Sequence, residues 1–353
     1  MNILLALDSY KGCLTSAQVE AAIANALTPT AHTLTSLPMT DGGDGMLPAF
    51  TSALRAETVT VRVHDPLMRP VEAQYAIAPD GTAIIETAQA CGLALLAPDE
   101  RNPLRATTFG VGELLAHARL SGCRRFIIGL GGSGTSDAGI GLLRGLLSRL
   151  KPDGDFDTMH RERFADCSFI LASDVRNPLC GPNGAAAVYG PQKGADEDMV
   201  AKLDLRARRF AEVSARHFGF DKSECEGAGA AGGLGYVFLQ YFGASVRSGA
   251  DLLFELSGFE DLVAKADLVI TGEGRADRQT LMGKLPERVL NVAQRHSKPV
   301  WLVCGSVADQ AELLAAGFSK VCAVSPSAMP LSEALKPDVA TQNLTNWARQ
   351  TLC

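Results

Sequence analysis

Five apolar, strand-like runs in this chain each end in a loop of Gly, Ser or Thr that also carries an acidic residue. In an open α/β sheet, ligands bind beyond the carboxyl ends of the strands, where such loops converge. Glycines let backbone N–H groups approach an anion, and carboxylates can hold a cation or a proton. The pattern therefore predicts one large polar site for a phosphorylated or anionic ligand. The five segments are 2–12, 36–45, 124–139, 168–184 and 267–284.

Strands and helices alternate at both ends of the chain. Short apolar runs separated by amphipathic helices are typical of parallel strands with right-handed crossovers. The first helix is expected from Thr15 to Leu27, with Thr15 or Ser16 as its cap. The other expected elements are strands at 3–8 and about 33–37, the strand runs DLVITGEG, PVWLVCG and KVCAVS, and helices at 285–295, 309–316 and 331–351.

Residues 57–87 have a different pattern, in which apolar and polar residues alternate around the turn signals Asp-Pro and Pro-Asp-Gly. This predicts an antiparallel β-meander. We expect it to open an inserted α/β domain, 57–261, within a discontinuous α/β domain formed by 1–56 and 262–353. Two such domains facing a cleft would suit a two-substrate enzyme. The polar segment 151–167 is poorly periodic and predicts a surface connection.

Composition narrows the class of protein. The chain has 353 residues, 46% hydrophobic and 20% charged, and a net charge of −6, which disfavours nucleic acid or an anionic membrane as partner. Its nine cysteines are scattered and form no C-x-x-C pair, which indicates reduced thiols rather than a disulfide framework or a zinc site. The N-terminus lacks the basic region of a signal peptide, and no apolar stretch is long enough to span a bilayer. We expect a cytoplasmic protein.

The segment IGLGGSGTSDAGIGLL follows a predicted strand and opens a helix, so its amides and hydroxyls predict a phosphate or anion site. The alternatives are a dinucleotide site and a purely structural turn. A formal G-x-G-x-x-G runs from Gly129 to Gly134, but the acidic residue expected about twenty positions later is missing, and a second match occurs at 227–232. A P-loop pattern is absent. The candidate cofactor-binding residues here are Gly131, Gly132, Ser133, Gly134, Thr135, Ser136 and Asp137.

Two acidic loops follow the first two strands. Asp41 and Asp44 in TDGGDG are predicted ligands of Mg²⁺, with capping of the next helix as the alternative. Asp8, Ser9 and Lys11 in DSYKG are predicted to contact substrate. A lysine there can neutralise a phosphate or carboxylate, although it could also be an exposed residue at the start of a helix.

Later loops supply the remaining candidates. Asp174 ends a strand and could accept a substrate hydroxyl proton, or simply form a turn. Lys193, held between Pro and Gly in YGPQKGA, is expected to be a positioned cation near the cofactor. The segment TGEGRADRQTLMGK is dense in charge, and its Arg275, Asp277 and Lys284 are predicted substrate ligands, with surface ion pairing as the alternative.

Seven motifs, in this order and spanning residues 1 to about 305, resemble the bacterial glycerate kinase type-1 family. The resemblance implies ATP-dependent phosphorylation of D-glycerate, at the 2-hydroxyl to give 2-phosphoglycerate, with 3-phosphorylation left open. It also implies two α/β domains, one of them flavodoxin-like, the other with a mixed sheet. The motifs are DSYKG, TDGGDG, ERNPLRATTFGVGELL, IGLGGSGTSDAGIGLL, SDVRNPLCGPNGAAAVYGPQKGA, GAGAAGGLG and DLVITGEGRADRQTLMGK.

The chain departs from the family pattern at a few places. Tyr10 stands where Phe is usual, Cys13 where Ser is usual and Asp44 where Glu is common, and the connection 145–167 is short. A shorter carboxylate could alter a metal contact. The shortened connection counts against an oligomer contact at this place.

Taken together, these expectations describe a kinase that uses ATP and Mg²⁺ and forms a possible homo-oligomer. Asp174 would be the base, Lys11 and Arg275 would hold the glycerate carboxylate, and Asp41, Asp44 and Asp277 would bind the metal. The alternatives are a nicotinamide-dependent hydroxy-acid oxidoreductase and a non-catalytic binding protein for sugar acids.

Overall fold

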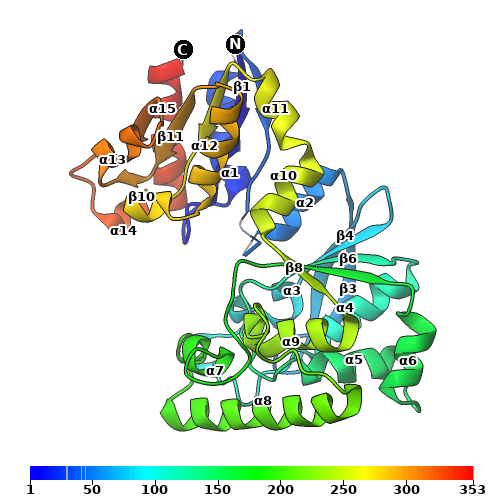
Figure 1. The fold of residues 1–353 in the computed structure, drawn as a ribbon. Helices are drawn as coiled ribbons and strands as arrows, with labels where there is room; N and C mark the ends of the chain where they lie inside the picture. The colour runs from blue at the N-terminus through cyan, green and yellow to red at the C-terminus, as the bar shows by residue number, and fades with distance from the viewer. Residues whose placement is uncertain (29–30, 41, 44, 353) are drawn as a thin grey trace. The chain divides into compact units, whose positions relative to one another are not determined.

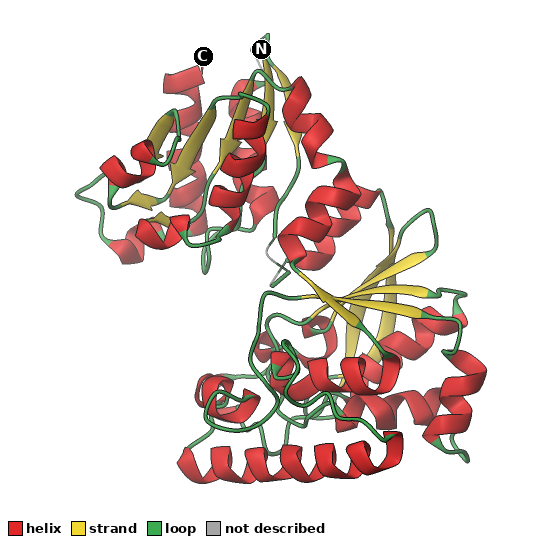
Figure 2. Cartoon of the chain, in the orientation of Figure 1, coloured by secondary structure: helices red, strands yellow, loops and turns green. Residues whose placement is uncertain are grey.

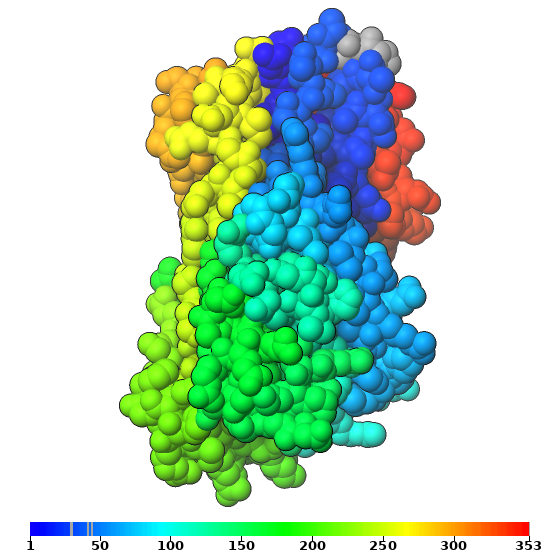
Figure 3. Space-filling model, turned by 90° about the vertical axis from the view of Figure 1, so that its right-hand side faces the viewer, coloured from blue at the N-terminus to red at the C-terminus, as the bar shows by residue number. Residues whose placement is uncertain are grey.

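The structure is a computed structural model, and it describes residues 1–28, 31–40, 42–43 and 45–352. The chain forms two compact units, each with its own sheet (Figures 1 and 2). The first unit contains Met1–Asp41, Pro48–Leu54 and Ala250–Cys353, and the second contains Gly42–Leu47 and Arg55–Gly249. Both ends of the chain therefore build the first unit, whose surface is blue and yellow to red in Figure 3. Residues 250–261, expected from the sequence in the inserted part, belong to this first unit.

The first unit has a five-stranded sheet in which all neighbouring strands are parallel, in the order β13-β11-β9-β1-β2. This is the flavodoxin-like order, whose switch point lies between the first and third strands, here β1 and β9. The predicted parallel sheet is confirmed. The strands are β1 (Asn2–Leu5), β2 (Thr33–Ser36), β9 (Leu268–Thr271), β11 (Val300–Cys304) and β13 (Lys320–Ala323), with a short parallel pair β10 (Arg275–Ala276) and β12 (Ser306–Val307).

Helices cover both faces of this sheet (Figure 1). Alternate residues Ile3 and Leu5 of β1 pack against α1 and α15, and α12 packs on β9 and β11. The side chain of Thr15 caps α1, as predicted. The predicted helix 331–351 is two helices, and the second begins at Pro337, because proline is tolerated only in the first turn. The helical elements are α1 (Ser16–Leu27), α2 (Met46–Leu54), α10 (Gly249–Ser257), α11 (Phe259–Lys265), η4 (Arg278–Leu281), α12 (Leu285–Arg295), α13 (Gln310–Ala315), α14 (Leu331–Ala334) and α15 (Pro337–Leu352); the first two residues of α2 belong to the second unit.

The second unit has a six-stranded mixed sheet in the order β3-β4-β5-β6-β7-β8. The first three strands pair antiparallel, which confirms the predicted meander, and the remaining pairs are parallel. The strands are β3 (Glu57–His64), β4 (Pro70–Ile77), β5 (Thr82–Glu86), β6 (Arg125–Gly129), β7 (Ser168–Ala172) and β8 (Ser245–Arg247).

One large apolar core fixes this sheet to its helices, with Phe126 and Ile128 of β6 packed among residues of α4, α5 and α9. The segment 151–167 is not a plain surface connection, because it contains α6. Asp155 caps this helix by accepting from the Thr158 N–H at 2.9 Å, and Met159 is buried. The helical elements are α3 (Ala88–Cys91), η1 (Leu93–Leu95), η2 (Pro98–Glu100), α4 (Phe109–Leu120), α5 (Ile140–Leu150), α6 (Phe156–Arg163), α7 (Ala185–Tyr189), η3 (Pro191–Lys193), α8 (Glu197–Phe218) and α9 (Ala230–Phe242).

Two general expectations can be compared with the described residues. Their eight cysteines are all free thiols. None of the described helices is long and apolar enough to cross a membrane.

Candidate functional site

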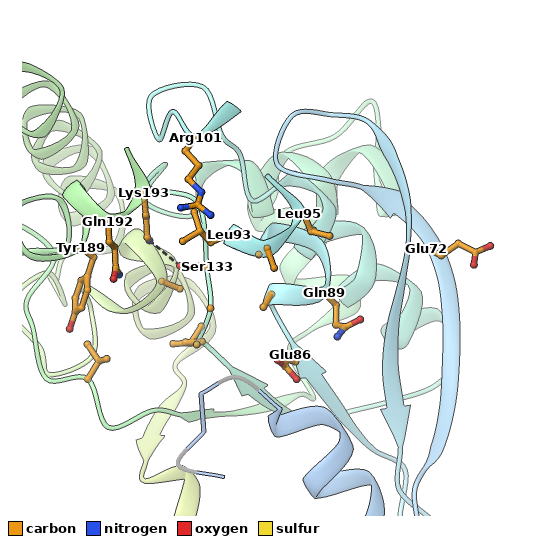
Figure 4. Close-up of a pocket in the computed structure, with 18 residues that line it drawn as sticks. Glu72, Glu86, Gln89, Leu93, Leu95, Arg101, Ser133, Tyr189, Gln192 and Lys193 are labelled. Atoms are coloured by element: carbon orange, nitrogen blue, oxygen red, sulfur yellow. Dashed lines mark hydrogen bonds between the residues drawn. The ribbon is translucent and has the colours of Figure 1, made fainter. Parts of the chain in front are cut away.

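A cavity of about 810 Å³ lies in the second unit, beyond the carboxyl ends of its parallel strands (Figure 4). Glu86 ends β5, Leu130 follows β6 and Val175 follows β7, and all three line the cavity. This is the edge at which open α/β sheets bind ligands, and the volume suits a small-molecule substrate. The remaining lining residues are Glu72, Ala88, Gln89, Gly92, Leu93, Ala94, Leu95, Arg101, Gly131, Gly132, Ser133, Tyr189, Gln192, Lys193 and Ala231.

The glycine-rich loop after β6 contributes only its first part to the cavity. Gly131, Gly132 and Ser133 line the cavity, whereas the predicted residues Gly134, Thr135, Ser136 and Asp137 do not line it and are buried. The Gly132 carbonyl accepts from Leu93 N–H at 2.8 Å, which fixes the loop against η1. A Cβ at Gly134 would lie 3.0 Å from the Leu93 Cα, so this close approach favours glycine.

The carboxylate of Asp137 accepts hydrogen bonds from other residues of the protein. Its carboxylate accepts from the N–H of Thr108 at 2.9 Å, from the hydroxyls of Thr107 and Thr108, and from the N–H groups of Gly139 and Gly141 at 3.1 Å. The amides at the start of α5 are therefore bound to Asp137, and the predicted anion site at this helix start is taken by a side chain. Asp137 holds the loop in place and does not face the cavity.

Lys193 is a buried cation at the edge of the cavity. The residue is 2% exposed, and Nζ donates to Ser133 Oγ at 3.0 Å and to the Thr135 carbonyl at 2.7 Å. Both acceptors are neutral, and within the described part of the chain no carboxylate forms an ion pair with it. Burial lowers the pKa of Lys193 to about 8, although Cys91 and Asp137 act in the opposite direction. An ammonium has three donors, so one N–H is left for a ligand.

Arg101 was not singled out from the sequence, although it lines the same cavity. Its Nε is buried and has no hydrogen-bond partner among the residues that the structure describes. Gly194, with φ +91°, brings the loop of Lys193 close to Arg101, since a Cβ there would lie 2.5 Å from the Arg101 carbonyl oxygen. The Asn-Pro turn that follows Arg101 restricts its loop, and that is the signal that could have indicated it.

The second formal glycine match, 227–232, runs into a left-handed turn. Ala231, Gly232 and Gly233 have φ values of 51°, 67° and 91°, and Ala231 lines the cavity. The Gly232 carbonyl accepts from Ala138 N–H at 3.1 Å, and a Cβ at Gly232 would collide with the Thr135 carbonyl. The turn therefore supports the glycine-rich loop from behind.

In the first unit, the loops after β1 and β9 meet at the switch point of the sheet. Asp8 N–H donates to the Gly272 carbonyl at 2.9 Å, and Ser9 N–H donates to Asp8 Oδ1 at 2.7 Å. A Cβ at Gly274 would lie 3.6 Å from the Lys11 backbone nitrogen, so the loops of Lys11 and Arg275 are neighbours. Both of these cationic side chains are exposed. The structure thus brings together two predicted segments at the edge where a ligand is expected.

Other charged residues of the 273–284 loop hold the loop itself. Buried Glu273 accepts from Thr280 Oγ1 at 2.7 Å and from Lys284 Nζ at 3.0 Å. Asp277 caps η4 by accepting from Gln279 N–H at 2.9 Å, and its other oxygen lies 3.6 Å from Arg275 Nε. Lys284 and Asp277 therefore each have a structural partner in addition to the predicted contact with substrate.

The remaining candidates are less tightly defined. Asp174 is exposed just after β7 and does not line the cavity, although the next residue, Val175, does. Asp41 and Asp44 lie outside the described residues. Among the described residues, no group of three His, Cys, Asp or Glu side chains could hold a metal ion.

Comparison with known proteins identifies the family. The model of the glycerate kinase family matches residues 3–353. The chain belongs to the glycerate kinase family. It is therefore a phosphotransferase, and membership of a kinase family implies the use of ATP.

Relatives of this glycerate kinase family member match it along nearly its whole length. Glycerate kinase from Bacillus subtilis (strain 168) is 39% identical, with 95% of this chain and 93% of the relative covered. Glycerate 2-kinase from Escherichia coli (strain K12) is 37% identical with the same coverage. The crystal structure of a Salmonella typhimurium LT2 protein, provisionally assigned as a glycerate kinase 2, matches with a TM-score of 0.82 and 37% identity over 99% of this chain and 96% of that one. The α/β fold with one parallel and one mixed sheet is confirmed.

Proposed function

We propose that this chain transfers the γ-phosphoryl group of ATP to the 2-hydroxyl of D-glycerate, giving 2-phosphoglycerate and ADP. The full-length relationship to proteins named glycerate kinase and glycerate 2-kinase supports the substrate and the position of attack. Buried Lys193 at the edge of the cavity supports nucleotide binding there, because its ammonium donates only to neutral acceptors and has no directly bonded counter-anion among the described residues. A phosphate would supply it.

The nucleotide phosphates are assigned to the second unit. Lys193 would neutralise them, with contacts from Ser133 and from the backbone of Gly131 and Gly132. Phosphoryl transfer depends on positioning and charge neutralisation more than on covalent chemistry. The hydrogen bonds from Lys193 to Ser133 and Thr135 fix its ammonium before the ligand arrives, so little reorganisation is needed on binding.

Glycerate is assigned to the residues at the switch point of the first sheet. Exposed Lys11 and Arg275 would hold its carboxylate, and Arg275 can do so with two parallel hydrogen bonds. Asp8, Ser9, Asp277 and Lys284 remain proposed substrate contacts. Asp174 remains the proposed acceptor of the hydroxyl proton.

Mg²⁺ would neutralise charge on the transferring phosphoryl group. Magnesium bound with a nucleotide takes one or two carboxylates and several phosphate and water oxygens, so it does not require a cluster of three acidic side chains. Asp277 would act as a single-oxygen ligand through Oδ2, since Oδ1 caps η4, and Oδ2 lies 3.6 Å from Arg275 Nε. Asp41 and Asp44 complete the proposed set. A cytoplasmic location and a homo-oligomer also remain predictions.

Neither formal G-x-G-x-x-G pattern forms the dinucleotide-binding turn that a nicotinamide-dependent oxidoreductase would need. The pattern Gly129–Gly134 is not followed directly by a helix, because α5 begins at Ile140 and Asp137 binds its first amides. The pattern at 227–232 forms a left-handed turn instead.

The test is a coupled assay of ADP release with D-glycerate and Mg-ATP, followed by ³¹P NMR of the product. We expect ADP release that depends on D-glycerate and a single product, 2-phosphoglycerate. Formation of 3-phosphoglycerate would overturn the position of attack and leave the kinase assignment intact. Failure to release ADP with D-glycerate would overturn the proposed substrate.

A further inference from the structure

Two cationic side chains, Lys193 and Arg101, line the cavity of the second unit. Lys193 donates only to neutral acceptors, and Arg101 Nε is buried without a partner among the residues that the structure describes. Leaving a buried ammonium without a directly bonded counter-charge, or a buried guanidinium N–H without an acceptor, is unfavourable. In a cavity, such a pair indicates that the missing partner is an anionic ligand.

Neither carboxylate of the lining supplies this counter-charge. Glu86 accepts from the N–H groups of Gly45 and Leu47, at 3.2 and 2.9 Å, near the start of α2. Glu72 is an exposed residue of β4 and points away from the two cations (Figure 4). The part of the cavity near Lys193 therefore keeps a positive charge.

The two ends of the cavity differ in character. Figure 4 shows Arg101, Lys193 and Ser133 turned toward one space, whereas Leu95 and Gln89 lie on the other side. The first end offers cations and a hydroxyl, and the second offers apolar surface with the amide of Gln89 and the carboxylates of Glu72 and Glu86 at its margin. A ligand with a charged part and a flat, mostly apolar part fits this arrangement, and a nucleotide has both.

We propose that Arg101 binds the polyphosphate of the nucleotide together with Lys193, and that the nucleoside lies toward Leu95 and Gln89. The proposal rests on the kinase function above and adds a residue to its nucleotide site. Arginine presents a planar fork of donors that matches two phosphate oxygens, whereas lysine acts as a compact charge. The two cations therefore play different parts: Lys193 neutralises charge, and Arg101 fixes orientation.

The proposal makes binding depend on phosphate content. Affinity should rise from adenosine to ADP to ATP, and inorganic tripolyphosphate alone should bind, because the cations recognise phosphate oxygens. Arg101 should contribute to each phosphate-containing ligand and not to adenosine. A purely structural arginine would affect all of these ligands alike.

The test compares wild type with Arg101→Met, Arg101→Lys and Arg105→Met by isothermal titration calorimetry. The probes are tripolyphosphate, a non-hydrolysable ATP analogue and adenosine. We expect Arg101→Met to weaken the first two by about 10-fold or more, the range for hydrogen bonds to a charged group, and to leave adenosine affinity within about 2-fold. Arg101→Lys should restore part of the loss. Arg105 is exposed, lies four residues away and does not line the cavity, so Arg105→Met should bind as wild type.

Equal tripolyphosphate affinity in Arg101→Met and wild type would overturn the proposal, as would an equal loss of adenosine and tripolyphosphate binding. Thermal unfolding of each variant checks that it is folded, and Arg101→Lys keeps the test open if the methionine variant is not. The outcome is separate from that of the product assay. Arg101-dependent tripolyphosphate binding without glycerate-dependent ADP release would support this site and overturn the acceptor substrate. Formation of 2-phosphoglycerate together with unchanged tripolyphosphate binding in Arg101→Met would support the acceptor substrate and overturn the role of Arg101.

Discussion

Replacing Lys193 by methionine should measure the cost of keeping a charge buried in the cavity. The ordinary lysine pKa is 10.5, and burial lowers that of Lys193 to about 8. Between these values the unfolded chain binds more protons than the folded one, so the stability of the wild type rises with pH. Below about pH 8 the folded protein bears the full cost, which is about 3 kcal/mol. Methionine has a similar length and carries no charge, so this pH-dependent contribution disappears in the variant.

The unfolding free energy of Lys193→Met minus that of wild type should therefore fall by about 1 kcal/mol from pH 7 to pH 9, because only the wild type gains stability as the pH rises. Loss of the hydrogen bonds to Ser133 and to the Thr135 carbonyl lowers the stability of the variant by an amount that does not depend on pH in this range. The pH-dependent contributions of the other titrating groups cancel in this difference, because the two proteins differ only at residue 193.

The assay is urea unfolding followed by near-ultraviolet circular dichroism of tyrosine. Four of the five tyrosines lie in the second unit, whereas both tryptophans, Trp301 and Trp347, lie in the first, so the tyrosine signal reports chiefly on the unit that contains Lys193. Burial also raises the pKa of Tyr75 and Tyr241, which keeps them protonated at pH 9 in the folded state.

The matched control is Lys202→Met, which removes an exposed lysine of α8 in the same unit. Its difference from wild type should not change with pH. A constant difference between Lys193→Met and wild type from pH 7 to pH 9 would refute the reasoning, because it would mean that the folded and unfolded pKa values of Lys193 are equal.

Three further substitutions test other parts of the second unit. Asp174→Asn should lower kcat far more than it raises the KM for glycerate, and an unchanged kcat in steady-state assays would rule out the base assignment. Asp137→Asn should lower the unfolding free energy by about 3 kcal/mol, since an amide NH₂ would face backbone N–H donors, and a stability equal to wild type in urea would contradict the structural role. Ala231→Gly removes the strain of a left-handed alanine, about 1–2 kcal/mol, but increases the conformational entropy of the unfolded chain, which costs about 0.4–1 kcal/mol. The thermal unfolding temperature of this variant should therefore be unchanged or slightly raised. A clear decrease would count against a strained turn.

The parts of the fold that depend on local pattern were predictable. The first helix, with Thr15 at its cap, and the β-meander follow from spacings within a few residues. The pairing of β1 with β9 joins Ile3 to Leu268, and no local signal gives that neighbour. Helix α6 was missed because only Met159 of its residues is buried, so its apolar periodicity is weak.

The site divides in the same way. Lys193 and the start of the glycine-rich loop were predicted from their own neighbours in sequence. Arg101 was not, because its place beside Lys193 depends on a backbone contact with Gly194, more than ninety residues away. The sequence predicts a ligand-binding role for Asp137, and the structure gives it a structural one. Its hydrogen-bond donors include Thr107 and Thr108, which lie some thirty residues upstream, so no local pattern indicates that its carboxylate is already bound.

The order of strands in the two sheets also has a consequence for synthesis on the ribosome. In the second unit, each strand from β4 to β8 pairs with the one made just before it, so this sheet can grow as the chain emerges and is complete at Arg247. In the first unit, β1 can pair with β2 early, but its other neighbour, β9, is made only after the inserted unit, and the last strand, β13, ends at Ala323. Because domains generally fold as units during translation, the inserted unit can reach its native state while the N-terminal strands β1 and β2 still lack β9 and the strands beyond it. The N-terminal residues, although made first, are then among the last to be secured.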